Sequence, residues 1–139
     1  MLTEDDQLRR VLQEAKVIAV VGASGTEDKA AHDVPAYLQD HGYEIVPVNP
    51  GSDQVLGQDT FDDLSEVDRQ IDVVDVFRPA DEAPGIARKA VALGANVLWL
   101  QQGISSDEAR EIAEDAGLEV VMDECMMVSH RRLLGDASS

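Results

Sequence analysis

The sequence predicts an α/β fold: a Rossmann-like, doubly wound, five-stranded parallel sheet in a single domain. Short apolar runs rich in β-branched residues alternate along the chain with amphipathic segments of helical length. Strands that alternate with helices, joined by right-handed crossovers, give a parallel sheet covered by helices on both faces. A length of 139 residues suits one domain, so we expect a single unit over residues 1–139.

The strands are predicted from continuous apolar runs, which are typical of strands buried on both faces of a parallel sheet. KVIAVV is the first such run, and EIVPV, DVVDVF and NVLWL follow it. A polar loop over residues 49–60 separates the second strand from the third. We expect strands at residues 16–21, 44–48, 72–77, 96–100 and 118–122.

The helices are predicted from periodicity and from their end signals. Leu8, Val11, Leu12 and Ala15 form a stripe with helical spacing, and Thr3 is a candidate cap before it. Later helices are bounded by a proline in the first turn, by glycine stops and by a capping box of Ser105 and Glu108. We expect helices at residues 1–15, from about 33 to 41, near 61–66, at 81–93, at 105–116 and at 125–133, followed by a frayed tail over 135–139.

For the sheet we expect the strand order 3-2-1-4-5, numbering strands along the chain. Ligands of such sheets bind beyond the carboxyl ends of the strands, where the order reverses. In this order the reversal lies between strands 1 and 4. The loops Gly22–Gly25 and Gln101–Gly103 would then flank the site.

Composition excludes several classes of function. The net charge is -17, from 28 acidic and 11 basic residues, which opposes binding to nucleic acid and suggests a surface adapted to high salt. An ordinary acidic protein is the alternative interpretation. No apolar run is long enough to span a membrane, and the acidic start is not a signal peptide, so we expect a cytoplasmic protein. Cys125 is the single cysteine, which excludes an internal disulfide.

The loop after the first strand departs from the dinucleotide fingerprint. In G-x-G-x-x-G counted from Gly22, the later glycine positions hold Ser24 and Glu27. The second strand ends at Asn49 rather than at the acid that binds a ribose, so NAD in its usual pose is disfavoured. Two interpretations stay open for the loop: a phosphate-binding turn, or a plain turn with Ser24 as a local cap. Asp75 fits a receiver phosphoacceptor poorly and is expected near a sheet edge.

Six segments together resemble a known family, the small single-domain CoA-binding proteins, which are similar to the CoA-binding domain of the succinyl-CoA synthetase α-subunit. The resemblance covers the chain from Lys16 to about Arg131. The matching segments are VVGAS (20–24), GYEIVPVNP (42–50), VLG (55–57), DVVDVFRP (72–79), VLWLQQGI (97–104) and VVMDEC (120–125).

The resemblance implies a domain that binds coenzyme A (CoA), and it assigns loops to parts of that ligand. The phosphates would meet the first glycine loop, and the pantetheine arm would lie near the loop after the fourth strand. The implied positions are Gly22, Ala23 and Ser24 for phosphate; Val48, Asn49 and Pro50 for the nucleotide; Val76, Phe77, Arg78 and Pro79 for adenine or pantetheine; and Gln101, Gln102 and Gly103 for the arm.

Two departures from the family remove positive charge near the phosphates: the chain has DKAAH after the loop and no lysine just past the second strand. Lys29, His32 and Arg78 are the candidates that would compensate. The synthetase's catalytic histidine lies in a second domain that this chain does not show. We therefore expect non-catalytic binding of CoA or an acyl-CoA. An NAD(P)-dependent oxidoreductase, a subunit of an acyl-CoA ligase completed by another chain, and an interaction domain stay as alternatives. A homodimer or another protein partner is left open.

Overall fold

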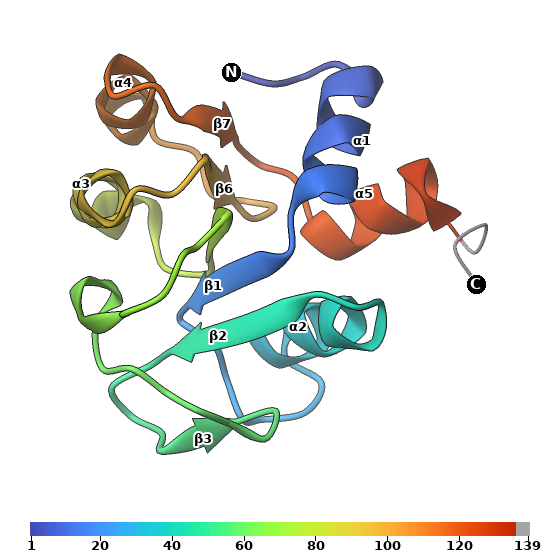
Figure 1. Cartoon of the computed structure of the whole chain (residues 1–139), viewed down its shortest axis with the longest axis vertical. Coiled ribbons are helices and arrows are strands. Elements are labelled where there is room, and N and C mark those ends of the chain that lie inside the picture. Colours follow the sequence, from blue (N-terminus) through green and yellow to red (C-terminus); the bar gives the residue numbers. More distant parts are fainter. Residues whose placement is uncertain (136–139) are drawn as a thin grey trace.

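The apolar runs of the sequence form the centre of the structure. The computed structural model describes residues 1–135, and its main sheet has five strands whose neighbours all run parallel (Figure 1). The strands of this sheet are β1 (Val17–Val21), β2 (Glu44–Val48), β5 (Val73–Val76), β6 (Val97–Leu100) and β7 (Glu119–Val121). The helices are α1 (Asp5–Glu14), α2 (Ala30–Asp40), α3 (Ala83–Leu93), α4 (Asp107–Asp115) and α5 (Met126–Leu133), with the 3-10 turns η1 (Leu64–Glu66) and η2 (Ala80–Glu82).

The class of fold is confirmed, but the expected strand order is wrong. The observed order is β2-β1-β5-β6-β7, which is 2-1-3-4-5 when the sheet strands are numbered along the chain. Pro47 in β2 gives the physical reason. Its carbonyl accepts a hydrogen bond from Phe61 N at 3.1 Å on the side away from β1, so its missing N–H also faces that side. A strand with this gap in its donors belongs at a sheet edge, not between two partners.

Both edges of the sheet are covered by other parts of the chain. Phe61 forms a parallel bridge with Val48 beyond β2. A hairpin of β3 (Gln54–Val55) and β4 (Gln58–Asp59) lies beside it, closed by a two-residue turn with φ of +53° at Leu56 and +76° at Gly57. At the other edge, Leu2 N donates to Val120 O of β7 at 2.8 Å. These contacts occupy backbone groups that another strand could otherwise pair with.

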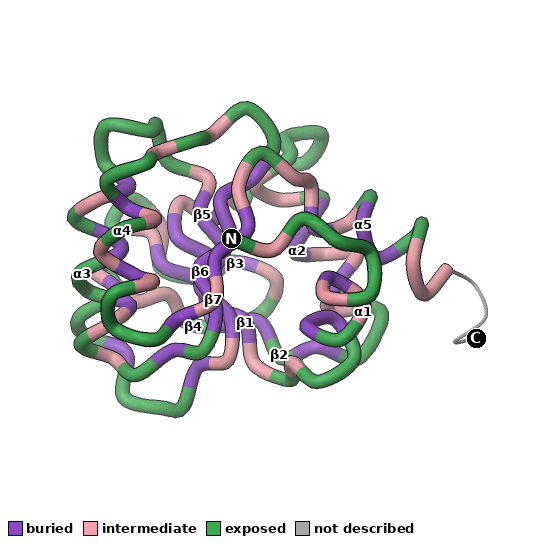
Figure 2. The backbone as a smooth tube through the Cα atoms, turned by 90° about the horizontal axis from the view of Figure 1, so that it is seen from above, coloured by how far each residue is buried: buried purple, intermediate pink, exposed green. Residues whose placement is uncertain are grey.

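Two helical layers bury the two faces of the sheet. The helices α3 and α4 pack against one face, and α1, α2 and α5 pack against the other (Figures 1 and 2). Strand residues alternate between the two cores, so that Ala19 faces the first layer and Val20 the second. Trp99 is fully buried in the second core, and its Nε1 donates to Glu124 O at 2.9 Å.

Several element boundaries differ from the sequence prediction. Helix α2 begins at Ala30 rather than near Asp33, and the hairpin replaces the expected loop over residues 49–60. Ser106, not Ser105, caps α4, because its hydroxyl accepts the Ala109 N–H at 3.1 Å. The cap of α1 is Glu4, which forms a capping box with Gln7, and not Thr3. The tail was predicted from residue 135, and residues 136–139 lie outside the described part of the chain.

No helix among residues 1–135 combines the length and the apolar character that a membrane crossing would need.

Candidate functional site

The observed strand order moves the topological switch point to the gap between β1 and β5. The chain leaves β1 toward α2 on one face of the sheet and leaves β5 toward α3 on the other. A cavity of about 310 Å³ lies at the carboxyl ends of these strands. Its lining residues are Val21 and Gly22 at the end of β1, Val48, Asn49 and Pro50 at the end of β2, Asp62, Asp63 and Leu64 around η1, Arg78 after β5, and Glu82, Ile86 and Lys89 from η2 and α3.

Gly22 and Arg78 meet at the centre of this switch point. Gly22 has a φ of +91°, a conformation that L side chains rarely adopt. A Cβ at this position would lie 2.9 Å from Arg78 Cδ and 3.3 Å from its Cγ. The aliphatic part of Arg78 therefore crosses the first glycine loop, and only glycine leaves room for it.

The glycine loop uses some of its donors and acceptors internally. Gly22 N donates to Val48 O at 2.9 Å and Ser24 N donates to Ala31 O at 3.0 Å, so neither N–H faces a ligand in this conformation. The Ser24 hydroxyl accepts the Thr26 N–H at 3.1 Å and keeps its own proton for donation. Asn49 Nδ2 donates to Ala23 O at 2.6 Å and ties the β2 exit to the loop. The loop therefore offers an anion the Ser24 hydroxyl but not the N–H groups of Gly22 and Ser24.

The start of α2 supplies a second cationic region. Lys29 is the N-cap residue of α2 and is exposed, and His32 lies in the first helical turn. The N-terminus of a helix favours anions because its first N–H groups and its dipole are positive. His32 Nδ1 lies 2.9 Å from Asp33 Oδ1, so the nearby carboxylate offsets part of this positive field.

Carboxylates hold both cations of the cavity. Arg78 donates from Nε to Glu82 Oε1 at 3.1 Å and from Nη2 to Oε2 at 2.8 Å. Lys89 Nζ lies 2.6 Å from Asp63 Oδ1. The Lys89 ammonium and the Ser65 N–H and hydroxyl lower the pKa of Asp63 to about 2, so Asp63 is ionised at neutral pH.

Asp75 lies in the middle strand of the sheet and not near an edge, which corrects the sequence expectation. Its side chain is fully buried and accepts Gln101 Nε2 at 2.6 Å, while Oδ2 has no partner among the described residues. Desolvation raises the pKa of Asp75 to about 7, and the hydrogen bond from Gln101 opposes this increase. The pair fixes Gln101 at the carboxyl end of β6.

The structure separates the predicted site residues into three groups. Gly22, Val48, Asn49, Pro50 and Arg78 line the cavity. A second group does not line the cavity and is partly or fully exposed: Ser24, Lys29 and His32 on the glycine loop and α2, Pro79 after β5, and Gln102 and Gly103 after β6. A third group is turned into the protein: Ala23 and Val76 are fully buried, Gln101 is 4% exposed, and Phe77 packs on the second core.

Four charged residues of the cavity were missed from the sequence: Asp62, Asp63, Glu82 and Lys89. They belong to the segment just before η1, to η2 and to α3, which only tertiary packing brings to the β1 exit. The bridge between Val48 and Phe61 is what places the η1 segment there. The charge of these residues did not mark them as site residues in the sequence, because acidic residues occur along the whole chain.

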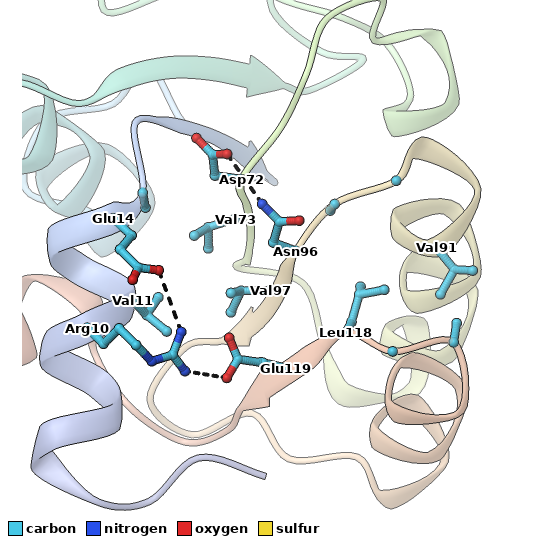
Figure 3. A pocket seen from close by; sticks show the side chains of 15 residues that line it. Arg10, Val11, Glu14, Asp72, Val73, Val91, Asn96, Val97, Leu118 and Glu119 are labelled. Atoms are coloured by element: carbon cyan, nitrogen blue, oxygen red, sulfur yellow. Dashed lines mark hydrogen bonds and ion pairs between the residues drawn. The ribbon is translucent and has the colours of Figure 1, made fainter.

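A larger hollow of about 610 Å³ lies at the opposite edge of the sheet, where the strands begin (Figure 3). Several of its polar side chains form ion pairs or hydrogen bonds with other parts of the protein. Arg10 pairs with Glu14 and Glu119, and Asp72 Oδ2 accepts the N–H groups of Lys16 and Val17 at 2.9 Å each. Ligands of parallel α/β sheets bind at the carboxyl edge, so the smaller cavity is the candidate site.

A glycine loop and a cavity at the switch point of a parallel sheet define a Rossmann-like domain. The chain belongs to the CoA-binding domain family, whose model matches residues 16–131. YneT of Bacillus subtilis, described as uncharacterized, is 42% identical over 124 residues, which cover 89% of this chain and 92% of YneT.

Two further comparisons agree with this assignment. The solved structure of a hypothetical protein from Pyrococcus horikoshii OT3 matches with a TM-score of 0.92 and 38% identity, over 96% of this chain and 94% of that one. ADP-forming acetate–CoA ligase of Methanocaldococcus jannaschii is 22% identical over 126 residues, which span 85% of this chain but only 18% of the ligase. The resemblance drawn from the sequence motifs is confirmed.

Proposed function

We propose that this chain binds coenzyme A or an acyl-CoA as a stand-alone, non-catalytic domain. The observation that carries the proposal is the cavity at the switch point, where Gly22 and Arg78 meet. Membership of the CoA-binding domain family supports the choice of ligand.

The chemistry of the cavity suits the nucleotide end of the ligand. Val21, Val48, Leu64 and Ile86 provide apolar surface for a planar base, and the charged residues form a polar rim. The Ser24 hydroxyl, Lys29, the start of α2 and Arg78 are the groups that would receive the phosphates. The exposed Gln102 and Gly103 at the β6 exit would lie along the pantetheine arm.

The same site geometry suits NAD less well than CoA. A dinucleotide site needs an acid at the end of the second strand to bind the ribose hydroxyls. Asn49 occupies that position, and its side chain is committed to Ala23 O at 2.6 Å and to the Gly51 N–H at 2.7 Å. We therefore place an oxidoreductase role below CoA binding.

Two measurements test the proposal. Native mass spectrometry of protein purified without added ligand is expected to show a co-purified CoA or acyl-CoA mass. Titration calorimetry in molar salt is expected to show tighter binding of CoA than of NAD or FAD. Equal or tighter NAD binding would contradict the proposal.

A second candidate is a subunit of an acyl-CoA ligase, favoured by the similarity to acetate–CoA ligase. Because the chain matches only 18% of that ligase, a partner chain would have to supply the remainder. The purified chain alone is then expected to show no ADP-forming acetate–CoA ligation. Activity that appears only after a copurifying chain is added would favour this candidate over the stand-alone role.

A further inference from the structure

The arginine fork at the switch point is already occupied. An arginine that recognises phosphate presents two parallel N–H groups to the ligand. In this protein two donors of that fork, Nε and Nη2 of Arg78, are bonded to the two carboxylate oxygens of Glu82, at 3.1 and 2.8 Å. A carboxylate and a phosphate compete for these two donors in the same geometry, so a phosphate can bind this face of the guanidinium only when Glu82 leaves it.

The remaining charges of the cavity do not relieve this competition. Lys89 is paired with Asp63, and Asp62 adds a further carboxylate. Two cations, Arg78 and Lys89, therefore face three carboxylates, Asp62, Asp63 and Glu82, which leaves the lining with a formal charge of -1. A polyanionic ligand gains little from this cavity until one carboxylate withdraws.

We propose that Glu82 sets the affinity of the site, as an internal carboxylate that occupies Arg78 and that a phosphate group of CoA displaces. This inference rests on the proposed function. The Arg78 and Glu82 side chains are 48% and 45% exposed, and ion pairs at such exposed positions are weak, so a ligand phosphate can replace the carboxylate.

After it leaves Arg78, the Glu82 carboxylate is still in a favourable electrostatic environment. Glu82 is the N-cap residue of α3, and a negative charge at the N-terminus of a helix is stabilised by the helix dipole. Because its side chain is about half exposed, it can turn toward solvent without unpacking the core. Arg78 stays in position meanwhile, since its stem is held against Gly22.

Calorimetric titration with CoA at one fixed salt concentration tests the role of Glu82 in four proteins: the wild type, Glu82→Gln, Arg78→Gln and the double variant. Glu82→Gln is expected to raise CoA affinity about threefold to fivefold, the effect of removing one exposed ion pair. In the Arg78→Gln background the same substitution is expected to give no such gain. Pantetheine, which carries no phosphate, is expected to bind the wild type and Glu82→Gln equally.

Glu111→Gln is the matched control, because it removes the same charge from the exposed surface of α4 and is expected to change CoA affinity by less than about 1.5-fold. Equal or weaker CoA binding by Glu82→Gln would overturn the role of Glu82, and so would an equal gain without Arg78. A wild type and variants that all fail to bind CoA would instead overturn the proposed function, and the role of Glu82 with it.

Discussion

The stem of Arg78 lies across Gly22, with its Cδ 2.9 Å from the point where a Cβ of residue 22 would stand. This contact joins the exits of β1 and β5, the two strands between which the sheet order reverses. Two features therefore require a residue without a side chain at position 22. One is its positive φ, and the other is the contact with the stem of Arg78. The position of the Arg78 guanidinium and the conformation of the loop at Gly22 depend on each other.

Gly22→Ala is expected to weaken both stability and CoA binding. The new methyl group meets Arg78 and sits at a φ of +91°, so we expect a loss of about 1–3 kcal/mol in the free energy of unfolding. Urea denaturation measures this loss. Gly85→Ala is the control, because Gly85 lies within α3 with no atom within 4 Å of an added Cβ. That change is expected to stabilise the protein by about 0.5–1 kcal/mol. Equal effects at the two glycines would refute the packing argument.

Ser24→Glu is expected to abolish CoA binding while the protein stays folded. Ser24 is partly exposed on the loop before α2, and a carboxylate there would compete with the phosphates for Lys29 and the helix start. Circular dichroism reports the fold and calorimetry reports binding. Thr3→Glu adds the same charge at an exposed N-terminal position and is expected to leave binding nearly unchanged. Normal CoA binding by folded Ser24→Glu would place the ligand elsewhere.

The sequence was sufficient for the class of fold because the strands of the main sheet are mostly apolar runs that alternate with amphipathic helical segments. To predict the order of the strands, the position of a proline also had to be taken into account. Pro47 marked β2 as an edge strand, since proline leaves a ladder donor missing, and an order with β2 between two partners ignored that signal. Once β2 is an edge, β5 takes the place on the other side of β1.

The site was predictable only where it follows directly from a strand end. Gly22 and Asn49 come right after a strand and Arg78 comes two residues after one, and parallel strands bring their ends together. Glu82, Lys89 and Asp63 enter the same cavity through the packing of α3 and η1, which no local pattern encodes. The pairing of Arg78 with Glu82 is visible as an i, i+4 spacing, but that spacing does not say that the pair faces a cavity.

Asp75→Asn is expected to remove a pH-dependent loss of stability. Below about pH 4 the Asp75 carboxyl is protonated in both states. As the pH rises from 4 to 7, the unfolded carboxyl ionises while the buried one, with a pKa of about 7, keeps its proton, so the free energy of unfolding falls and then levels off. Asparagine keeps an oxygen for Gln101 Nε2 and does not titrate.

Urea denaturation at pH 4.5, 6 and 8 measures this effect as the difference between Asp75→Asn and the wild type. We expect the difference to grow with pH in favour of the variant, to an upper limit of about 4 kcal/mol. Asp115→Asn, at an exposed position of α4, is the control and is expected to show a small, nearly constant difference. A difference for Asp75→Asn that stays constant across this range would mean that the buried carboxyl does not control the pH dependence.

Salt is expected to raise both thermal stability and CoA affinity between about 0.1 and 1 M, where the Debye length falls from roughly 10 to 3 Å. A chain with a net charge of -17 repels itself and repels a polyanionic ligand, and salt screens both effects. The cations of the cavity are not expected to reverse this sign, because Arg78 and Lys89 are each paired with a carboxylate. Thermal melts and CoA titrations at the two concentrations measure the effect, with pantetheine, which lacks phosphates, as the ligand whose affinity is expected to change little. A fall in CoA affinity with salt, as a basic phosphate site shows, would mean that Lys29, His32 and Arg78 outweigh the field of the whole protein.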